Sequence, residues 1–312
     1  MAGNMRGTEP APTHAPAPGA VPATPPEGTP PPARTAEAVE VTAAAQASAE
    51  NFPVALRILP ARYRRHLMAL YGFARLTDDI GDEASPEERL RLLDELDADV
   101  TRIYDGVTPQ LAAMQELATT VAQCHVPAQP LRDLIQANRQ DQLVTRYETF
   151  EDQVGYCRLS ANPIGCVVLH IFGAASPARE RLSDSICTAL QLAEHWQDVA
   201  EDFGKGRIYL PQDDLRKFGV AEPDLATPVT GPRVRALLAY EVARASALLD
   251  EGAPLVGTLR GAARLAVAGY LAGGRAALTA ITASGYDVLA VTPHPDKRVT
   301  ARLAIQAFLR GR

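Results

Sequence analysis

Apolar residues recur at three- and four-residue spacing along almost the whole chain after Glu50. This period places them on one face of an α-helix, whereas a half-buried strand would alternate apolar and polar residues. Runs with this period span residues 56–71, 90–103, 111–121, 131–144, 164–172, 182–202, 234–249 and 260–281. Pro and Gly residues separate the runs, and no convincing run of strand period occurs. We therefore predict an all-α domain, a single bundle of about eight to ten helices.

Residues 1–45 differ in composition from the rest of the chain. Ten of the 25 prolines precede Ala33, mixed with Ala, Gly and Thr. Such a segment cannot bury enough apolar surface to offset the entropy of ordering it, so we predict that it is disordered. We assign residues 46–290 to the helical domain and residues 291–312 to a C-terminal segment with a short helix. Residues 213–232, which contain three prolines, should form a long loop.

The charge balance argues against a nucleic-acid partner. The net charge is −6 and only three of the 31 basic residues are Lys, so the basic block that nucleic-acid binding requires is lacking. The four cysteines form no CxxC pair, which favours free thiols in a reducing cytoplasm.

The N-terminus lacks the layout of a signal peptide. The apolar stretch 254–289 is interrupted by three Arg residues, so it cannot supply the ~20 uncharged residues of a spanning helix. We expect a cytoplasmic protein, with room for a peripheral membrane contact.

Two acidic clusters carry the clearest chemical signal. The first occupies residues 78–83, DDIGDE, at the end of a predicted helix. Asp78 and Asp82 are four residues apart, so both project from one helical face. Like charges at that spacing repel each other, and acids near a helix C-terminus also oppose the helix dipole. This local cost indicates that a cation is bound there.

The second cluster occupies residues 198–202, DVAED. Asp198 and Asp202 are again four residues apart, and Glu194 lies one turn earlier on the same face. The turn GKGR, residues 204–207, follows at once. Carboxylates suit Mg²⁺, which binds through a few of them and through phosphate oxygens, while Lys and Arg neutralise the remaining phosphate charge. The pattern predicts a metal–diphosphate site, because neither cluster has the spaced ligands of an EF-hand loop.

Three longer blocks contain these clusters. They comprise residues 51–54 (NFPV), 59–60 (LP) and 71–79 (YGFARLTDD), then 156–165 (YCRLSANPIG), then 191–202 with 206–211 (GRIYLP). On these blocks, across residues 50–289, the chain resembles the squalene/phytoene synthase family, and within it the bacterial branch that forms hydroxysqualene for hopanoid biosynthesis. The resemblance implies a single-domain isoprenoid-synthase helical bundle with a central cavity.

The resemblance also implies a role for each matching position. About two or three Mg²⁺ ions would be held by Asp78, Asp82, Asp198 and Asp202, with Glu194 as a further ligand where many family members carry Asn. Diphosphate would be bound by Arg75, Arg207 and Lys205, and by Gln197 where many members carry Arg. The remaining substrate-binding positions are Phe52, Tyr71, Tyr156, Asn162, Tyr209 and Tyr270. Catalysis is assigned to the four aspartates, the two arginines and Tyr209.

The implied reaction is the Mg²⁺-dependent conversion of presqualene diphosphate to hydroxysqualene. The diphosphate leaves, the cyclopropylcarbinyl cation rearranges in an apolar pocket, and water captures it. No NADPH is expected, because this outcome needs no hydride and no dinucleotide-binding fingerprint is present. An upstream synthase would supply presqualene diphosphate, which leaves room for a transient contact with that enzyme. Two alternatives stay open: head-to-head condensation of prenyl diphosphates to squalene or phytoene, and a non-catalytic helical scaffold.

Overall fold

Helices make up nearly all of the regular structure. The computed structural model describes residues 59–310, so Phe52 and the tail predicted to be disordered lie outside the described residues. The helices are α3 (Ala61–Glu83), α4 (Pro86–Tyr104), α5 (Ala112–Cys124), α6 (Ala128–Asp141), α7 (Phe150–Ser160), α8 (Asn162–Ile171), α9 (Pro177–Gln197), α10 (Val199–Gly204), α11 (Gln212–Phe218), the 3₁₀ helix η1 (Glu222–Ala226), α12 (Pro232–Gly252), α13 (Leu255–Thr258), α14 (Gly261–Ala283) and α15 (Lys297–Arg310). Between residues 59 and 310, β structure is limited to an isolated bridge between Arg146 and Ile208. The all-α prediction is confirmed.

Local sequence explains where several helices begin and end. Ser85 precedes α4 and Pro86 occupies its first position, where the fixed φ of proline suits the helix. A capping box begins α7: Thr149 Oγ1 accepts from the backbone N–H of Asp152 at 3.1 Å, and Asp152 Oδ2 accepts from the N–H of Thr149 at 3.0 Å. Helix α11 ends at Phe218 and is followed by Gly219, whose φ of 65° is a left-handed conformation that glycine adopts without steric cost.

The helix predicted over residues 182–202 is divided in two. Helix α9 ends at Gln197 and α10 begins at Val199. Asp198 between them has φ −104° and ψ 17°, which departs from helical geometry. The N–H of Asp202 nevertheless donates to the carbonyl of Asp198 at 2.9 Å, so helical hydrogen bonding resumes directly after the junction.

The long loop predicted over residues 213–232 is partly helical, because α11 and η1 fall within it. Leu215 and Leu225 are buried there, at 3% and 2% exposure. Prolines suggested a loop to us, but burial of these two leucines orders the segment instead.

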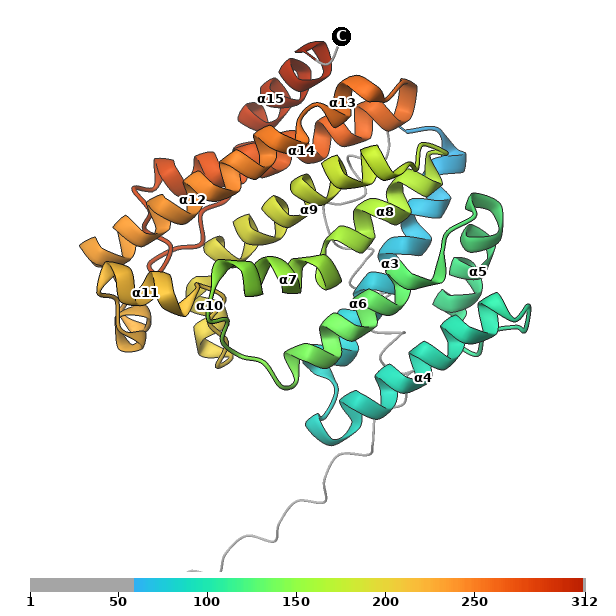
Figure 1. Cartoon of the computed structure of the whole chain (residues 1–312), viewed down its shortest axis with the longest axis horizontal. Helices are drawn as coiled ribbons and strands as arrows, with labels where there is room; N and C mark the ends of the chain where they lie inside the picture. Colours follow the sequence, from blue (N-terminus) through green and yellow to red (C-terminus); the bar gives the residue numbers. More distant parts are fainter. Residues whose placement is uncertain (1–58, 311–312) are drawn as a thin grey trace, which may run out of the picture. The chain divides into compact units, whose positions relative to one another are not determined.

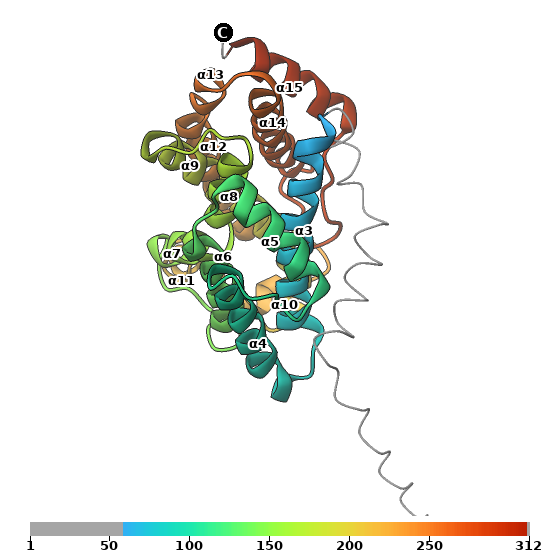
Figure 2. The ribbon, with the colours of Figure 1, turned by 90° about the vertical axis from the view of Figure 1, so that its right-hand side faces the viewer.

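Two buried hydrophobic clusters hold the helices together. One joins α3–α6 with α8 and includes Phe73 and Leu92. The other centres on α9, α12 and α14 and includes Trp196 and Leu271. Figure 1 shows α9 between α12 on one side and α7 and α8 on the other, followed by α6 and α4. In the second view, α3 runs beside α5 (Figure 2).

Helix α14 is the most apolar long helix. By length and composition alone it could cross a bilayer, but 56% of its most apolar stretch is buried within the fold. It contacts α9, α12 and α15. The Arg275 guanidinium on α14 donates to Asp250 Oδ1 of α12 at 2.7 Å. Packing within the bundle therefore accounts for the apolar character of α14.

Candidate active site

The five acidic side chains predicted to bind metal line one cavity. Its volume is about 670 Å³. Asp78 and Asp82 come from the C-terminal end of α3, Glu194 from α9, Asp198 from the junction between α9 and α10, and Asp202 from α10. The fold thus brings the two acidic clusters to facing walls of a single space.

Three predicted diphosphate-binding cations line the same cavity. Arg207 Nη1 lies 2.8 Å from Asp82 Oδ1, which joins the two walls. Arg75 Nε lies 2.8 Å from Oδ1 of Asp79. Lys205 Nζ lies 2.9 Å from a carboxylate oxygen of the residue four positions earlier. Each cation therefore has a carboxylate partner. A bound diphosphate would compete with these carboxylates for the three cations.

Three carboxylates of the cavity, those of Asp78, Glu194 and Asp202, have pKa values above the usual range of such groups. Removal from bulk water raises the pKa of Asp78 to about 6. It also raises the pKa of Glu194 and of Asp202 to about 7, and the neighbouring Asp198 adds to both shifts. The physical causes are desolvation and like charge, which both disfavour the ionised form. A bound cation would relieve this accumulation of negative charge.

The donor set of this cavity fits Mg²⁺. All five predicted ligands offer carboxylate oxygens, which are the hard donors that Mg²⁺ takes in proteins. Two more buried carboxylate oxygens beside them, Asp79 Oδ2 and Asp141 Oδ1, have no hydrogen-bond partner among the described residues. A buried acceptor without a partner is costly, so these oxygens add to the demand for a cation and its coordinated water.

A second cavity, of about 420 Å³, adjoins the acidic one. It is lined mainly by apolar residues of α3, α8, α9 and α14, and the predicted Tyr71 and Tyr270 are among its lining residues. The residues that line both cavities are Asp78, Leu134, Ser160, Gln191 and Glu194. The two cavities therefore suit an amphiphile with an anionic head and a hydrocarbon tail.

Tyr156 and Tyr209 line the acidic cavity and not the apolar one. The Tyr209 ring stacks on His195, with ring centroids 3.7 Å apart and planes at 7°. Burial lowers the pKa of His195 to about 3, so this imidazole is neutral at physiological pH. The Tyr156 hydroxyl donates to Asp141 Oδ2 at 2.6 Å. These contacts hold the rings of Tyr156, Tyr209 and His195 together in the lining of the acidic cavity.

Two predicted substrate-binding residues do not line either of these cavities. Asn162 begins α8, and its Oδ1 accepts from Thr188 Oγ1 at 2.9 Å, which ties α8 to α9. Gln197 ends α9 and donates from Nε2 to the carbonyl of Pro293. Ala161, the residue before Asn162, does line the apolar cavity. Gln197 lines a third cavity together with Glu194 and Asp198.

Two site residues on α6 were missed by the sequence analysis. Asn138 Nδ2 donates to Asp78 Oδ1 at 3.2 Å, and Asp141 accepts the Tyr156 hydrogen bond. The hydrogen bond from Asn138 to Asp78 depends on Gly81. A Cβ at position 81 would lie 2.1 Å from Asn138 Oδ1 and would displace the amide. The available signal was spacing: Asn138 and Asp141 are three residues apart and so share a helical face.

Ser160 was also missed, at the end of α7. It lines both cavities, and its buried Oγ has no hydrogen-bond partner in residues 59–310. Its polar neighbour at the joint of the cavities is Gln191 of α9. A hydroxyl with spare hydrogen-bonding capacity at this joint can hold a water molecule or a phosphate oxygen.

Comparison with known proteins yields consistent similarities. The sequence profile of the squalene/phytoene synthase family matches residues 45–304. The hydroxysqualene synthase of Sinorhizobium fredii is 35% identical over 214 residues, which are 68% of this chain and 72% of that protein. The phytoene synthase of Mycobacterium tuberculosis is 34% identical over 213 residues, 67% and 70% of the two chains. The crystal structure of squalene synthase HpnC from Alicyclobacillus acidocaldarius superposes with a TM-score of 0.73 at 38% identity, covering 80% of this chain and 94% of that one.

Proposed function

The chain belongs to the squalene/phytoene synthase family, a family of isoprenoid synthases, and from this premise we propose that it converts presqualene diphosphate to hydroxysqualene. The observation that carries the proposal is the junction of the acidic and apolar cavities at Asp78 and Glu194. A diphosphate seated between the two acidic clusters would place its carbon chain in the apolar cavity. The similarity to proteins named hydroxysqualene synthase supports the choice of branch.

Mg²⁺ fits the acidic cavity, where Asp78, Asp82, Asp198 and Asp202 would hold it, with Glu194 at the joint. When bound, Mg²⁺ supplies Lewis-acid stabilisation of the departing diphosphate. The protein contributes the placement of these carboxylates on helices α3, α9 and α10. Asn138 adds to this by fixing the orientation of Asp78 through its hydrogen bond.

Arg207 and Arg75 would bind the diphosphate oxygens. As the C–O bond breaks, its electron pair leaves with the diphosphate, and negative charge grows on the oxygens that these guanidinium groups face. Lys205, the most exposed of the three cations, with 51% of its side chain exposed, would contribute at the rim. Arg207 has only 14% of its side chain exposed, so it is the cation that acts with the least screening by solvent.

The carbocation left behind would rearrange in the apolar cavity, beside Tyr71 and Tyr270. Aromatic faces attract a cation, by about 0.5–2 kcal/mol each. Water would then attack the rearranged cation: its oxygen forms the new C–O bond, and a proton passes to a nearby acceptor. Ser160 and Gln191 supply polar atoms where the two cavities join, and these atoms would bind the attacking water by hydrogen bonds.

A condensing reaction is the second candidate, because phytoene synthases match this chain at nearly the same identity as the hydroxysqualene synthases do. A product assay separates the two. Purified protein with Mg²⁺ and without nicotinamide would receive presqualene diphosphate in one tube and farnesyl diphosphate in another, followed by mass spectrometry of extracted lipids. We expect hydroxysqualene from the first tube alone. Presqualene diphosphate or a hydrocarbon from the second would assign the chain to the condensing branch.

Absence of product in both tubes would favour a non-catalytic helical scaffold. A binding measurement then tests that alternative. On our proposal, Mg²⁺ with pyrophosphate stabilises the protein by about 2.7 kcal/mol at a ligand concentration of 100 Kd. Asp198→Asn should abolish both turnover and this stabilisation. Asp213→Asn, at an exposed aspartate of α11, is the matched control and should change neither.

We further propose a cytoplasmic enzyme that touches an anionic membrane through α15. This helix carries Lys297, Arg298, Arg302 and Arg310 and no acidic residue, in a chain whose net charge is −6. Ile305 and Leu309 are four residues apart and 61% and 52% exposed, and they follow Arg298 and Arg302 at helical spacing on the same face of α15. An upstream synthase that makes presqualene diphosphate could deliver this lipid-like substrate at the same surface.

The membrane contact predicts binding to phosphatidylglycerol vesicles and little binding to phosphatidylcholine vesicles in a flotation assay. Ile305→Glu should abolish binding. Leu143→Glu is the matched control, because Leu143 is 80% exposed and lies in the connection between α6 and α7. Equal loss in the two variants would contradict a specific role for α15.

A further inference from the structure

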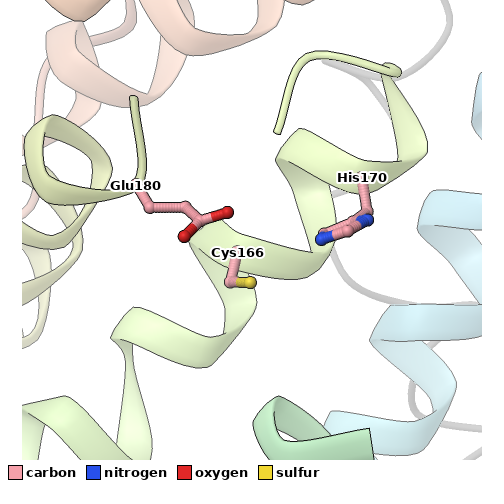
Figure 3. A group of neighbouring side chains, drawn as sticks. All are labelled: Cys166, His170 and Glu180. Atoms are coloured by element: carbon pink, nitrogen blue, oxygen red, sulfur yellow. The ribbon is translucent and has the colours of Figure 1, made fainter. Parts of the chain in front are cut away.

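A second group of metal-binding side chains lies outside the two cavities, where α8 meets α9. Cys166 and His170 are one turn apart on α8, and Glu180 lies in the first turn of α9. Figure 3 shows the three side chains gathered around a common space. A thiol sulfur, an imidazole nitrogen and a carboxylate oxygen there all lie within 4.8 Å of one another. We propose that Cys166, His170 and Glu180 bind a divalent transition metal of the zinc class.

The donor chemistry selects the kind of metal. A thiolate and an imidazole are ligands of Zn²⁺ and of related ions such as Co²⁺, whereas Mg²⁺ prefers oxygen ligands alone. Around a tetrahedral zinc, with bonds of about 2.0–2.3 Å, ligand atoms lie about 3.3–3.8 Å apart. A small rotation of the side chains would bring the three atoms to that spacing. Three protein ligands leave a fourth position open to water.

The three ligand atoms are free to bind. Within residues 59–310, the side chains of Cys166, His170 and Glu180 form neither a hydrogen bond nor an ion pair that would compete with a metal. All three residues are partly exposed, so an ion can reach them from solvent. Two of the ligands lie on one helix at i and i+4, which is a spacing that directs both side chains to one face.

Besides Glu180, the carboxylates of Asp184 and Asp133 lie near enough to act on the Cys166 thiol. Burial, and then the charges of Glu180, Asp184 and Asp133, raise the pKa of the Cys166 thiol to about 11. The thiol is therefore protonated at neutral pH. When the sulfur–metal bond forms, the S–H bond breaks and its proton passes to solvent. The step involves no oxidation, and each bound metal releases one proton from this cysteine.

The site would fasten one wall of the apolar cavity. Gly165, next to Cys166, lines that cavity, as does Ser183 of α9. The close approach of the helices there leaves no room for a Cβ at Gly165, which would lie 2.3 Å from Ser183 Oγ. A metal shared by α8 and α9 would hold this approach in place, so we assign the site a stabilising role and no part in the chemistry of the acidic cavity.

Cobalt provides a direct test. Full-length protein, freed of metal by a chelator and kept in excess Mg²⁺, would be titrated with Co²⁺. We expect a thiolate-to-cobalt charge-transfer band that saturates at one Co²⁺ per chain, together with a rise in melting temperature. Cys166→Ser should remove the band. Glu180→Gln should weaken binding by at least about tenfold, the cost that even indirect losses carry at metal sites.

Two matched variants keep the test sharp. Cys124→Ser, at a cysteine of α5, should leave the band unchanged, and Asp198→Asn should leave it unchanged because the acidic cavity holds no thiol. Circular dichroism would verify that each variant is folded. Absence of the band in the wild-type protein, its survival in folded Cys166→Ser or His170→Ala, or its loss in Asp198→Asn would each overturn the proposal. The readout is spectroscopic, so it does not depend on the proposed reaction.

Discussion

Arg207 Nη1 lies 2.8 Å from Asp82 Oδ1, and this ion pair joins the end of α3 to the turn after α10. Both side chains are proposed to act on the diphosphate complex, Asp82 toward metal and Arg207 toward phosphate. Binding would exchange one carboxylate–guanidinium contact for two contacts to the ligand, so the two clusters respond to the ligand together.

Replacement of Arg207 tests its role in the departure of diphosphate. Arg207→Ala should lower kcat by roughly 10²–10³-fold, the usual cost of removing a preorganised donor to developing charge. The kcat of Arg207→Lys should lie between the values for this variant and the wild type, because Lys keeps the positive charge but cannot form the bidentate hydrogen bonds of a guanidinium group. Steady-state kinetics would measure both. Arg216→Ala is the control, since Arg216 has 61% of its side chain exposed; a similar loss there would argue against a specific effect.

Loss of Asn138 should weaken metal binding. Its amide orients Asp78 from a distance of 3.2 Å, so Asn138→Ala should raise the Mg²⁺ concentration needed for half-maximal activity by about 10–100-fold. Activity at saturating Mg²⁺ should be largely retained, which distinguishes positioning from chemistry. A Mg²⁺ titration of activity measures this, with Gln129→Ala at an exposed position of α6 as control. An unchanged Mg²⁺ requirement would remove Asn138 from the site.

The acidic cavity makes the stability of the metal-free protein dependent on pH. Glu194 and Asp202 have folded-state pKa values raised to about 7, above those of an unfolded chain. The folded protein therefore binds more protons, and the stability from these groups is full below about pH 4 and lost as pH rises toward 7. Urea unfolding at several pH values should show this decrease, and a smaller decrease in Glu194→Gln. Mg²⁺ with pyrophosphate should restore stability at high pH; identical pH profiles for the two proteins would contradict the account.

Two glycine-to-alanine changes should have opposite effects. A Cβ at Gly165 would lie 2.3 Å from Ser183 Oγ and 2.6 Å from Cys187 Sγ. Gly165→Ala therefore requires these side chains to leave their present positions or α8 to move from α9, and should cost about 1–3 kcal/mol of stability. Gly155 on α7 has no heavy atom within 4 Å of such a Cβ. Gly155→Ala should therefore stabilise the protein by up to about 1 kcal/mol, through helix propensity. Chemical denaturation measures both, and destabilisation by Gly155→Ala would show that the packing account is incomplete.

Periodicity predicted the helices well because most of them bury one continuous apolar face. It could not predict the division at Asp198, since Val199 is apolar and continues the helical period through the junction. The prolines of residues 213–232 concealed α11, whose formation depends on burying Leu215 against a distant part of the chain. Tertiary packing decided both cases.

In the candidate site, too, some residues could be predicted from the sequence and others depend on tertiary packing. Asp78, Asp82, Asp198 and Asp202 were found because charged residues repeat within a short segment, and that repetition is visible in sequence. Asn138 and Ser160 are single polar residues on helices. Only the packing of α6 against α3, and of α7 against α6 and α9, makes them part of the site. Asn162 and Gln197 are instead held by hydrogen bonds to Thr188 and to the carbonyl of Pro293, and sequence spacing does not reveal such tertiary partners.

The isolated bridge between Arg146 and Ile208 has a consequence for engineering this scaffold. The N–H of Ile208 donates to the carbonyl of Thr145 at 2.9 Å, and Arg146 Nη1 donates to the carbonyl of Gly206 at 2.7 Å. Arg207 is thereby held between two residues that are both fastened to the connection between α6 and α7. A chimaera that exchanges the GKGR turn alone would separate Arg207 from the α6–α7 connection to which the residues on either side of it are hydrogen-bonded. The two segments form one transplantable module and should be exchanged together.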